Sequence, residues 1–136
     1  MQEVFYFELD GETPSKKNSR INLPNGRSIP NKKFQDWHKA SMVQLSPQRK
    51  PIKPIDVPVA ITLSFYHGDL RRRDSDNGTS SIMDLLVDAK ILSDDNWQIV
   101  RQIDVFNYYE KNRARCRVTI TAKEDSDVRE NFQHDF

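Results

Sequence analysis

Residues 57–67, VPVAITLSFYH, constrain the fold most strongly, because apolar and polar side chains alternate over the length of a strand. The positions of one face are all apolar, namely Val57, Val59, Ile61, Leu63 and Phe65. A period of two is typical of a strand with one buried face. The chain is therefore expected to build a β-sheet that other elements cover on one side.

A helical pattern follows in residues 79–91, TSSIMDLLVDAKI. Its apolar stripe consists of Ile82, Leu85, Leu86 and Ala89. Ser80, Asp84 and Asp88 are spaced i, i+4 and line another face of the same helix. Either Asn77 or Thr79 is expected to cap its N-terminus.

The remaining elements complete an α+β pattern. Strands are expected at 3–9, at 97–109 with Trp97 entering the core, and at 114–122, where Cys116 faces inward. Residues 110–113 are a candidate hairpin turn, and 11–30 read as a long loop. A second helix runs from Asn31 to Pro47, with Phe34, Trp37, Met42 and Leu45 on one side. This order predicts one small domain with a mixed sheet of about four strands packed with two helices.

Composition limits the class of protein. The 136 residues suit one domain, residues 1–123, followed by an acidic tail at 124–136 that is expected to be flexible and carries a net charge of −4. The chain has no apolar run of about 18 residues and no basic N-terminal region, so neither a membrane span nor a secretory signal is expected. One cysteine argues against disulfides and zinc. A cytoplasmic location is the simplest expectation.

The net charge of +1 hides a basic domain, because removing the −4 of the tail leaves +5 for residues 1–123. Residues 14–39 hold seven lysines and arginines against the single acid Asp36. Such clustering is typical of a polyanion-binding surface, but a solvated loop explains it equally well. His38, His67 and His134 show no ligand spacing, although His67 precedes an arginine run and could approach a phosphate.

Two acidic stretches carry the candidate chemistry: RRRDSDNGT at 71–79 and SDDNWQ at 93–98. They indicate either a neutralised surface loop or a divalent cation beside an arginine-bound phosphate backbone. An EF-hand register that starts at Asp74 fails, because it puts Thr79 where glycine is needed and Leu85 where glutamate is needed. Magnesium needs only one or two carboxylates and accepts phosphate oxygens, so it stays the candidate metal.

A metal site formed within one chain sets a condition on the topology. A right-handed parallel crossover between strands 57–67 and 97–109 would leave Asp95 at the opposite end of the sheet from Asp74 and Asp76. The three acids can meet in one chain only if these strands are antiparallel, or if the helix packs across the sheet.

Residues 71–100, RRRDSDNGTSSIMDLLVDAKILSDDNWQIV, resemble the core motif of the RusA-type Holliday-junction resolvases. Asp74, Asp76 and Asn77 match its opening, MDLLVDAKIL matches its helix, and Asp94, Asp95, Gln98 and Ile99 match its close. The stretch PSKKNSR at 14–20 is similar, more weakly, to the family's basic loop. The family consists of small, homodimeric, magnesium-dependent endonucleases, often carried by phages and prophages.

The resemblance implies that Asp74, Asp76 and Asp95 are the catalytic, metal-binding acids and that Mg²⁺ is the cofactor. Asp94 is then a neighbour of open role, and Asp84 a helix position where the family also tends to have aspartate. One departure is Ser80, because family members often carry lysine four residues after the second Asp of the motif. Arg71, Arg72, Arg73 or a lysine of the 14–39 loop would have to supply that charge.

The expected activity is resolution of four-way DNA junctions in recombination and repair by paired nicks, with a two-fold homodimer presenting two active sites. The residues expected to hold DNA phosphates are Lys16, Lys17, Arg20, Arg71, Arg72 and Arg73. Two alternatives stay open. The chain could be a branched-DNA-binding module of the same fold with weak or no turnover, or a basic accessory protein without a DNA role.

Overall fold

The computed structural model describes residues 2–16 and 20–123, so the predicted acidic tail at 124–136 lies outside the described residues. The fold is α+β, as the sequence predicts: a mixed four-stranded sheet with two helices, and a separate two-stranded hairpin. The elements in chain order are β1 (Gln2–Asp10), β2 (Arg20–Asn22), β3 (Ser28–Pro30), α1 (Lys32–Leu45), β4 (Val59–His67), α2 (Thr79–Asp88), β5 (Val100–Tyr109) and β6 (Arg115–Lys123).

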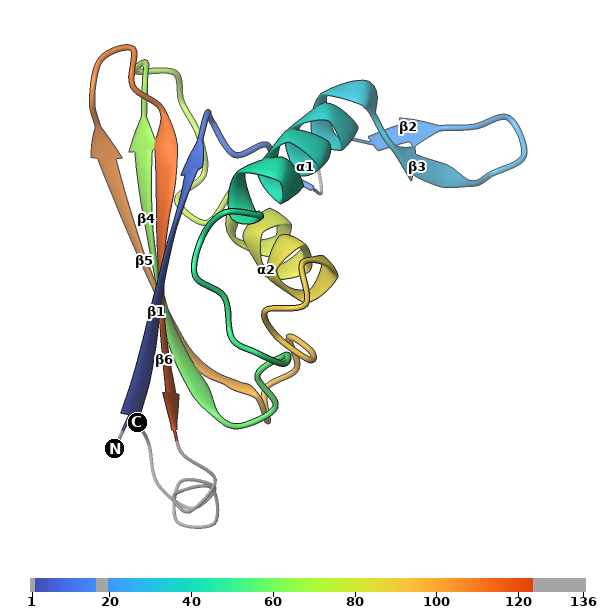
Figure 1. The fold of residues 1–136 in the computed structure, drawn as a ribbon. Coiled ribbons are helices and arrows are strands. Elements are labelled where there is room, and N and C mark those ends of the chain that lie inside the picture. Colours follow the sequence, from blue (N-terminus) through green and yellow to red (C-terminus); the bar gives the residue numbers. More distant parts are fainter. Residues whose placement is uncertain (1, 17–19, 124–136) are drawn as a thin grey trace.

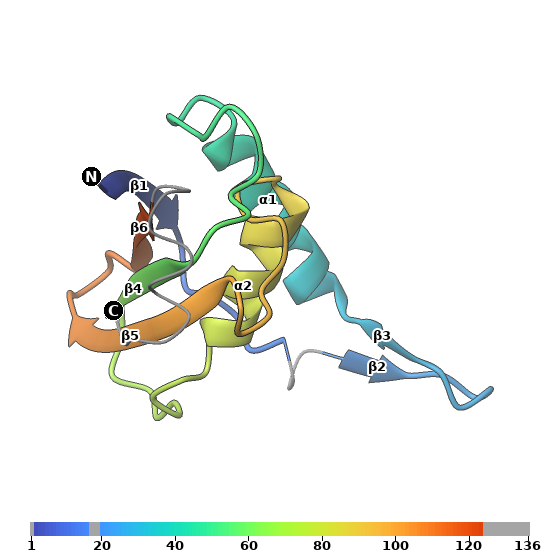
Figure 2. The same ribbon diagram turned by 90° about the horizontal axis from the view of Figure 1, so that it is seen from below.

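The sheet has the strand order β1-β6-β4-β5, with β4 and β1 both antiparallel to β6. β4 and β5 are parallel, and α2 returns the chain between them. Both helices cover the same face of the sheet, whereas the β2–β3 hairpin projects away from it beyond the start of α1 (Figures 1 and 2). No helix among the described residues is long and apolar enough to cross a membrane.

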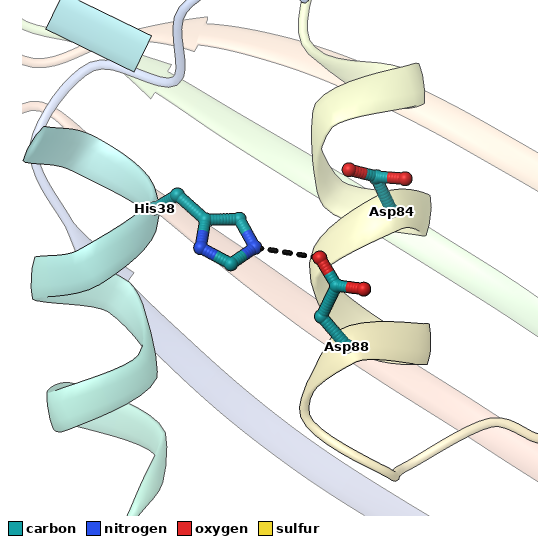
Figure 3. A group of neighbouring side chains, drawn as sticks. All are labelled: His38, Asp84 and Asp88. Atoms are coloured by element: carbon teal, nitrogen blue, oxygen red, sulfur yellow. Dashed lines mark hydrogen bonds and ion pairs between the residues drawn. The ribbon is translucent and has the colours of Figure 1, made fainter. Parts of the chain in front are cut away.

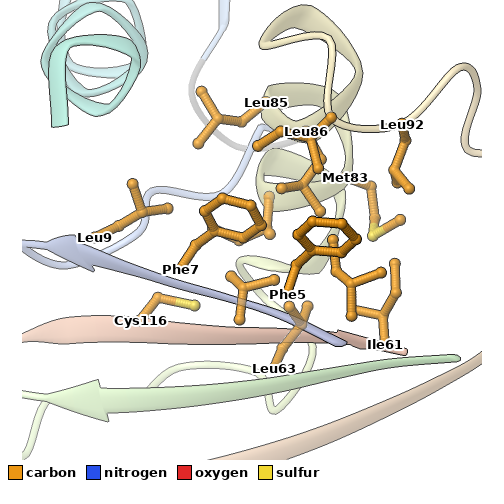
Figure 4. Close-up of a cluster of buried hydrophobic side chains, with 14 of the residues drawn as sticks. Phe5, Phe7, Leu9, Ile61, Leu63, Met83, Leu85, Leu86, Leu92 and Cys116 are labelled. Carbon is orange, nitrogen blue, oxygen red and sulfur yellow. The ribbon is translucent and has the colours of Figure 1, made fainter. Parts of the chain in front are cut away.

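The core lies between the sheet and the helices (Figure 4). The predicted inward faces are confirmed, because the β4 positions Val59, Ile61, Leu63 and Phe65 are all buried. β6 contributes Cys116, Val118 and Ile120 to the same core, and α2 contributes Ile82, Leu85 and Leu86. Burial of large side chains of this kind provides about 1.5–3 kcal/mol each, which makes this layer the main source of stability.

Helix α1 begins and ends where the sequence predicts. The Asn31 side chain accepts a hydrogen bond from the backbone N–H of Phe34 (3.0 Å), and Trp37 is buried.

The end of α1 also covers β1, which is one edge of the sheet. Gln44 accepts from the Asp10 N–H (2.7 Å), and Gln48 accepts from the Glu8 N–H (2.9 Å). These side chains satisfy backbone groups that an open edge would expose.

Four local expectations are wrong. The loop expected at 11–30 contains the β2–β3 hairpin. The strand expected from 97 begins at Val100, and Trp97 is 67% exposed in the preceding turn, outside the core. The N-cap of α2 is Gly78, without a side-chain hydrogen bond, in place of Asn77 or Thr79. Tertiary contacts explain the glycine at position 78, because a Cβ there would lie 2.8 Å from the Phe65 ring and 2.9 Å from Thr13 Cγ2.

Candidate functional site

The first two candidate acids lie in the connection between β4 and α2, beyond the end of the strand. Asp74 and Asp76 frame a turn in which the Asn77 N–H bonds the Asp74 carbonyl and the Thr79 N–H bonds the Asp76 carbonyl. Both side chains are exposed, and within the described chain neither carboxylate forms an ion pair or a hydrogen bond with another side chain. Exposed, uncommitted carboxylate oxygens are the donor set that a hard cation such as Mg²⁺ prefers.

A network of buried and half-buried groups fixes this loop to the sheet. Arg73 pairs with Asp69 (2.9 Å) and with Glu12 (3.3 Å), and its side chain is only 17% exposed. His67 contacts Glu12 through Nδ1 (2.9 Å) and Asn107 through Nε2 (2.8 Å).

Asn107 completes the anchoring, because its Nδ2 donates to the Ser75 carbonyl (2.9 Å). The Arg73 guanidinium, followed by the Arg71 N–H, lowers the pKa of Asp69 below its ordinary value. The loop that bears the two acids is therefore held against the last residues of β5.

A pocket of about 380 Å³ opens at this end of the sheet. It is formed by the end of the parallel strand pair and by the anchored loop, with the lining residues His67, Asp69, Leu70, Arg71, Arg73, Asp74, Ser75, Asn107, Tyr108 and Tyr109. The larger pocket, of about 670 Å³, lies among residues 49–57 and the start of β1 and contains none of the candidate acids.

Hydrogen bonds also connect residues 14–16, the start of the basic segment 14–39, to α2. Ser81 is fully buried; its hydroxyl donates to the Pro14 carbonyl (2.6 Å) and accepts from the Lys16 N–H (2.9 Å). With the backbone of Lys16 fixed in this way, its ammonium group lies 3.1 Å from the Asp84 carboxylate. Asp84 lies one helical turn after Ser80, the position where the family often has lysine. The ammonium group of Lys16 therefore lies near that position.

The third candidate acid, Asp95, lies next to Asp94 in the turn that precedes β5. Asp94 accepts hydrogen bonds from the Asp95 N–H (2.7 Å) and from Asn96 Nδ2 (3.0 Å), and these bonds, that of Asn96 first, lower the pKa of Asp94. Asp94 therefore shapes the turn before β5, and the Asp95 side chain is exposed next to it.

The parallel pairing of β4 and β5 puts this turn at the opposite end of the sheet from the β4–α2 loop (Figure 1). Ser75 is tied to Asn107, and the Asn96 carbonyl accepts from the Val100 N–H. The strand from Val100 to Asn107 spans about 23 Å. Oxygen atoms that share one Mg²⁺ lie only about 3–4 Å apart. The antiparallel arrangement, one of the two that would allow a single-chain site, is therefore wrong, and the parallel pairing leaves Asp95 at the far end of the β4–β5 pair from Asp74 and Asp76.

Another set of side chains does come together. Among the described residues, one group of three His, Cys, Asp or Glu has ligand atoms within 4.8 Å of one another: His38, Asp84 and Asp88 (Figure 3). His38 Nε2 contacts Asp88 (2.8 Å), and Lys16 pairs with Asp84, so both carboxylates already have cationic or hydrogen-bonding partners. Sequence analysis missed His38, since α1 and α2 meet only in the tertiary structure.

The candidate phosphate-binding residues differ in their surroundings. Arg71 and Arg72 are exposed, and Arg72 has no ion pair with any described residue. Arg20 binds Ser28 across the β2–β3 hairpin, and Arg73 is committed to the loop anchor. Lys17 lies outside the described residues. The hairpin and the start of α1, residues 20–33, carry four basic residues and no acid.

On β6, Arg115 and Arg117 pair with carboxylates of the same chain. Arg115 is only 5% exposed and lies against Glu110 (3.0 Å), Glu8 (3.6 Å) and the Tyr66 ring (3.9 Å). Arg117 also pairs with Glu8 (3.3 Å). These two cations are therefore paired within the chain, whereas Arg71 and Arg72 on the β4–α2 loop and Arg27 on the hairpin are exposed.

The fold and these surfaces define a class: a small α+β protein with free carboxylates and exposed arginines at one end of its sheet, suited to a phosphate-backbone ligand. A family model described as endodeoxyribonuclease RusA matches residues 10–121, most of the chain. The chain belongs to this family of endodeoxyribonucleases, which hydrolyse DNA and resolve branched junctions. A comparison with curated proteins finds no match.

Proposed function

We propose that the chain is a Mg²⁺-dependent endonuclease that resolves four-way DNA junctions by paired nicks, acting as a two-fold homodimer. The observation that carries the proposal is the pair of uncommitted carboxylates, Asp74 and Asp76, on a loop anchored beside exposed arginines. The family match supplies the general reaction, hydrolysis of DNA at branched junctions.

In a two-fold dimer, acids that lie apart within one chain can come together between two chains. Each chain carries Asp74 and Asp76 at one end of the β4–β5 pair and Asp95 at the other. A two-fold axis that reverses the strand direction brings the Asp95 end of one chain to the Asp76 end of its partner. We propose that each of two equivalent sites combines Asp74 and Asp76 of one subunit with Asp95 of the other.

The roles of the residues follow from their surroundings. The three carboxylates hold the cation, and the Arg73–Glu12–Asp69 network fixes the loop so that Asp74 and Asp76 need little reordering on binding. Bound Mg²⁺ would lower the pKa of a coordinated water and offset charge on the scissile phosphate. Arg71 and Arg72 bind neighbouring phosphates.

The remaining basic contacts come from the hairpin arm. Residues 20–33, which include Arg20, project from the body of the protein (Figure 2) and are placed to follow a DNA backbone away from the site. Lys16 supplies positive charge beside α2, and we assign Lys17 to the same basic segment. Because these contacts displace counterions, binding is expected to weaken steeply with salt.

The alternative function is a branched-DNA-binding module without turnover. Ser80 favours it, because the family often has lysine at that position. The ion pair between Lys16 and Asp84 favours activity, since it brings an ammonium group within one helical turn of Ser80. Lys16→Met therefore provides an internal test of whether this lysine replaces the missing one.

The experiment uses a synthetic four-way junction with and without Mg²⁺, resolved on a denaturing gel and, in parallel, by gel shift. We expect the wild-type protein to cut opposing strands in Mg²⁺, and Asp76→Asn to bind the junction without cutting it. Asp36→Asn, an exposed acid on α1, is the matched control and should cut normally. Binding without products in the wild-type protein would favour the module. Cutting by Asp76→Asn at the wild-type rate would contradict the metal assignment.

A further inference from the structure

The pocket of about 670 Å³ beside residues 49–57 has no part in the proposed site. Its lining comes from the connector between α1 and β4 and from core side chains that include Phe5, Ile55 and Ala122. Ala122 pairs with Val59, the first residue of β4, so the pocket lies at the end of the sheet where β4 begins and β6 ends (Figure 1). The proposed reaction therefore leaves this pocket unexplained.

The wall of the pocket combines exposed apolar and basic side chains. Ile52 is fully exposed, and Lys50 and Lys53 beside it are also exposed. Among the described residues, neither of these two lysines has an ion-pair partner, whereas Arg49 lies over the Phe5 ring (4.9 Å). An apolar surface next to free cations fits a ligand that carries both apolar groups and carboxylates.

The chain contains such a segment directly after β6. Residues 124–136, EDSDVRENFQHDF, hold five acids and one arginine. Their large apolar residues, Val128, Phe132 and Phe136, are spaced by four, which would put them on one side of a helix. The family model matches residues 10–121, so this segment lies outside the matched part of the chain.

We infer that residues 124–136 dock in this pocket, with their apolar side chains against its core residues and their carboxylates beside Lys50 and Lys53. The docked tail shields these two lysines from other polyanions. This docking does not depend on the proposed function, because it uses none of the residues assigned to the reaction.

Connectivity favours the tail over a separate ligand. β6 ends at Lys123, and its neighbour Ala122 lines the pocket. Thirteen extended residues span about 43–47 Å, so the tail has ample length to cover a pocket that lies beside its first residue. A segment joined to its site by a short link has an effective concentration of about millimolar. Even a contact too weak to hold a separate peptide is therefore formed within one chain.

The charges of the tail and the pocket match in both senses. In the described part of the lining, Asp56 is the acid without an ion pair, since Glu3 pairs with Arg49 (3.4 Å). Arg129 is the one basic residue of the tail. A nucleic acid has no cation for Asp56 and no aliphatic or aromatic side chain to cover Ile52. The tail supplies both, so it suits this pocket better than a phosphate backbone does.

The pocket is connected to the segment that leads to Asp95. The Ile55 N–H donates to the Ile91 carbonyl (2.9 Å), and the Ile55 carbonyl accepts from the Ser93 N–H (2.9 Å). A tail docked beside Ile55 therefore places its carboxylates at the same end of the sheet as Asp95. These carboxylates repel a polyanion that approaches this end. Under the proposed function, DNA has to displace the tail to bind here.

The first test is a disulfide between the tail and the pocket. Ile52→Cys combined with Phe132→Cys should form a link within one chain under mild oxidation, at least tenfold faster than a control pair, because docking brings the two positions together. The control combines Phe132→Cys with Tyr6→Cys, which is 71% exposed on the outer face of the sheet. Tyr6 lies about 13 Å along β1 from Gln2, the partner of Lys123, so the tail can also reach it.

The readout separates a link within one chain from a link between chains. The former removes two hydrogens from the intact mass and leaves the mobility of one chain on a non-reducing gel. The native Cys116 gives little background, because it is buried and burial raises its pKa to about 12. Equal rates for the two pairs would overturn the docking. A link mainly between chains would show that the tail occupies the pocket of a second copy, which also overturns it.

The second test measures the shielding with heparin, a polyanion without bases. Phe132→Ser leaves the net charge unchanged but removes an apolar contact, so it should raise the heparin affinity at least threefold at a fixed salt concentration. Val43→Ser, at an exposed position of α1, is the matched control and should bind as the wild type does. In a background of Lys50→Gln and Lys53→Gln, Phe132→Ser should have no effect. An unchanged affinity of Phe132→Ser in the native background would contradict the shielding.

Neither measurement uses a junction or a metal, so this docking and the proposed function can fail separately. A tail that links to the pocket in a protein that does not cut junctions supports the docking and contradicts the proposed function. Junction cutting together with equal linking rates and unchanged heparin affinity supports the proposed function and overturns the docking alone.

Discussion

Mixing two inactive variants tests whether the catalytic acids come from different subunits. Asp76→Asn and Asp95→Asn should each abolish cutting, because each variant homodimer carries the same lesion in both composite sites. In a mixed dimer the lesions fall together in one site, and the other site is intact. It has Asp74 and Asp76 from the Asp95→Asn chain and Asp95 from the Asp76→Asn chain.

The expected recovery follows from the separation in the structure. The strand from Val100 to Asn107, which separates the two ends, spans about 23 Å, so under the proposed arrangement an intact site requires two chains. Random exchange at equal concentrations makes about half of the dimers mixed, and each has one working site out of two. We therefore expect about one quarter of the wild-type sites to be active.

The assay is cutting of a supercoiled plasmid with an extruded cruciform. Paired nicks linearise the plasmid, whereas a dimer with one active site produces open circles. Mixed variants should therefore give open circles as the main product. The matched control mixes Asp76→Asn with Asp74→Asn, whose lesions lie in the same half of the site, so no intact site forms. Failure of the first mixture to cut, after exchange has been verified, would refute the composite site.

Two further predictions concern the fold that supports the site. Gly78→Ala should lower the free energy of unfolding by about 1–3 kcal/mol, because the new Cβ collides with Phe65 and Thr13. Urea unfolding measures this change. The control is Ser80→Ala, at an exposed position of the same helix, which should change the free energy of unfolding by less than about 0.5 kcal/mol. The hydrogen bond from Arg115, and then that from Arg113, lowers the pKa of Glu110, so its stabilisation is present above its ordinary pKa of 4.5 and is lost as pH falls below it. Urea midpoints of Glu110→Gln should therefore fall less steeply than those of the wild type below pH 4.5, and equal slopes would contradict this.

Local periodicity accounts for the parts of the fold that the sequence predicts well. The alternation of β4 and the Asn31 cap of α1 each depend on contacts within a few residues. The core positions Val59, Ile61 and Leu63 follow from the same periodicity, because a strand buried on one side leaves little choice of inward face. The general activity was expected from the resemblance of residues 71–100 to a known family, and the family match supports it.

The errors arise where distant contacts decide. Gly78 replaces a polar cap because Phe65 and Thr13 leave no room for a side chain. Trp97 looks like a core residue by hydrophobicity, but it lies in a turn with Arg101 over its ring (5.9 Å). The direction of β5 relative to β4 has no local signature, since period two is the same in parallel and antiparallel strands. That direction decides where Asp95 lies.

Charge shows most clearly why composition alone misjudges the DNA surface. The sequence presents two arginine-rich runs of equal weight, 71–73 and 113–117. In the second, Arg115 is buried against two carboxylates, so it contributes little attraction to a phosphate. In the first, Arg73 is similarly committed, but Arg71 and Arg72 remain exposed.

Two groups of exposed cations lie on the β4–α2 loop and on the hairpin arm. The β4–α2 loop and the start of the hairpin arm lie toward the same end in both views (Figures 1 and 2), and Thr13 packs directly against Gly78 between them. A polyanion attracted to this end meets Asp74 and Asp76 at the same time. Carboxylates so close to bound phosphates are unfavourable unless a cation neutralises them, because like charges repel strongly at short range. DNA binding and metal binding at this loop should therefore be coupled, each raising the affinity for the other.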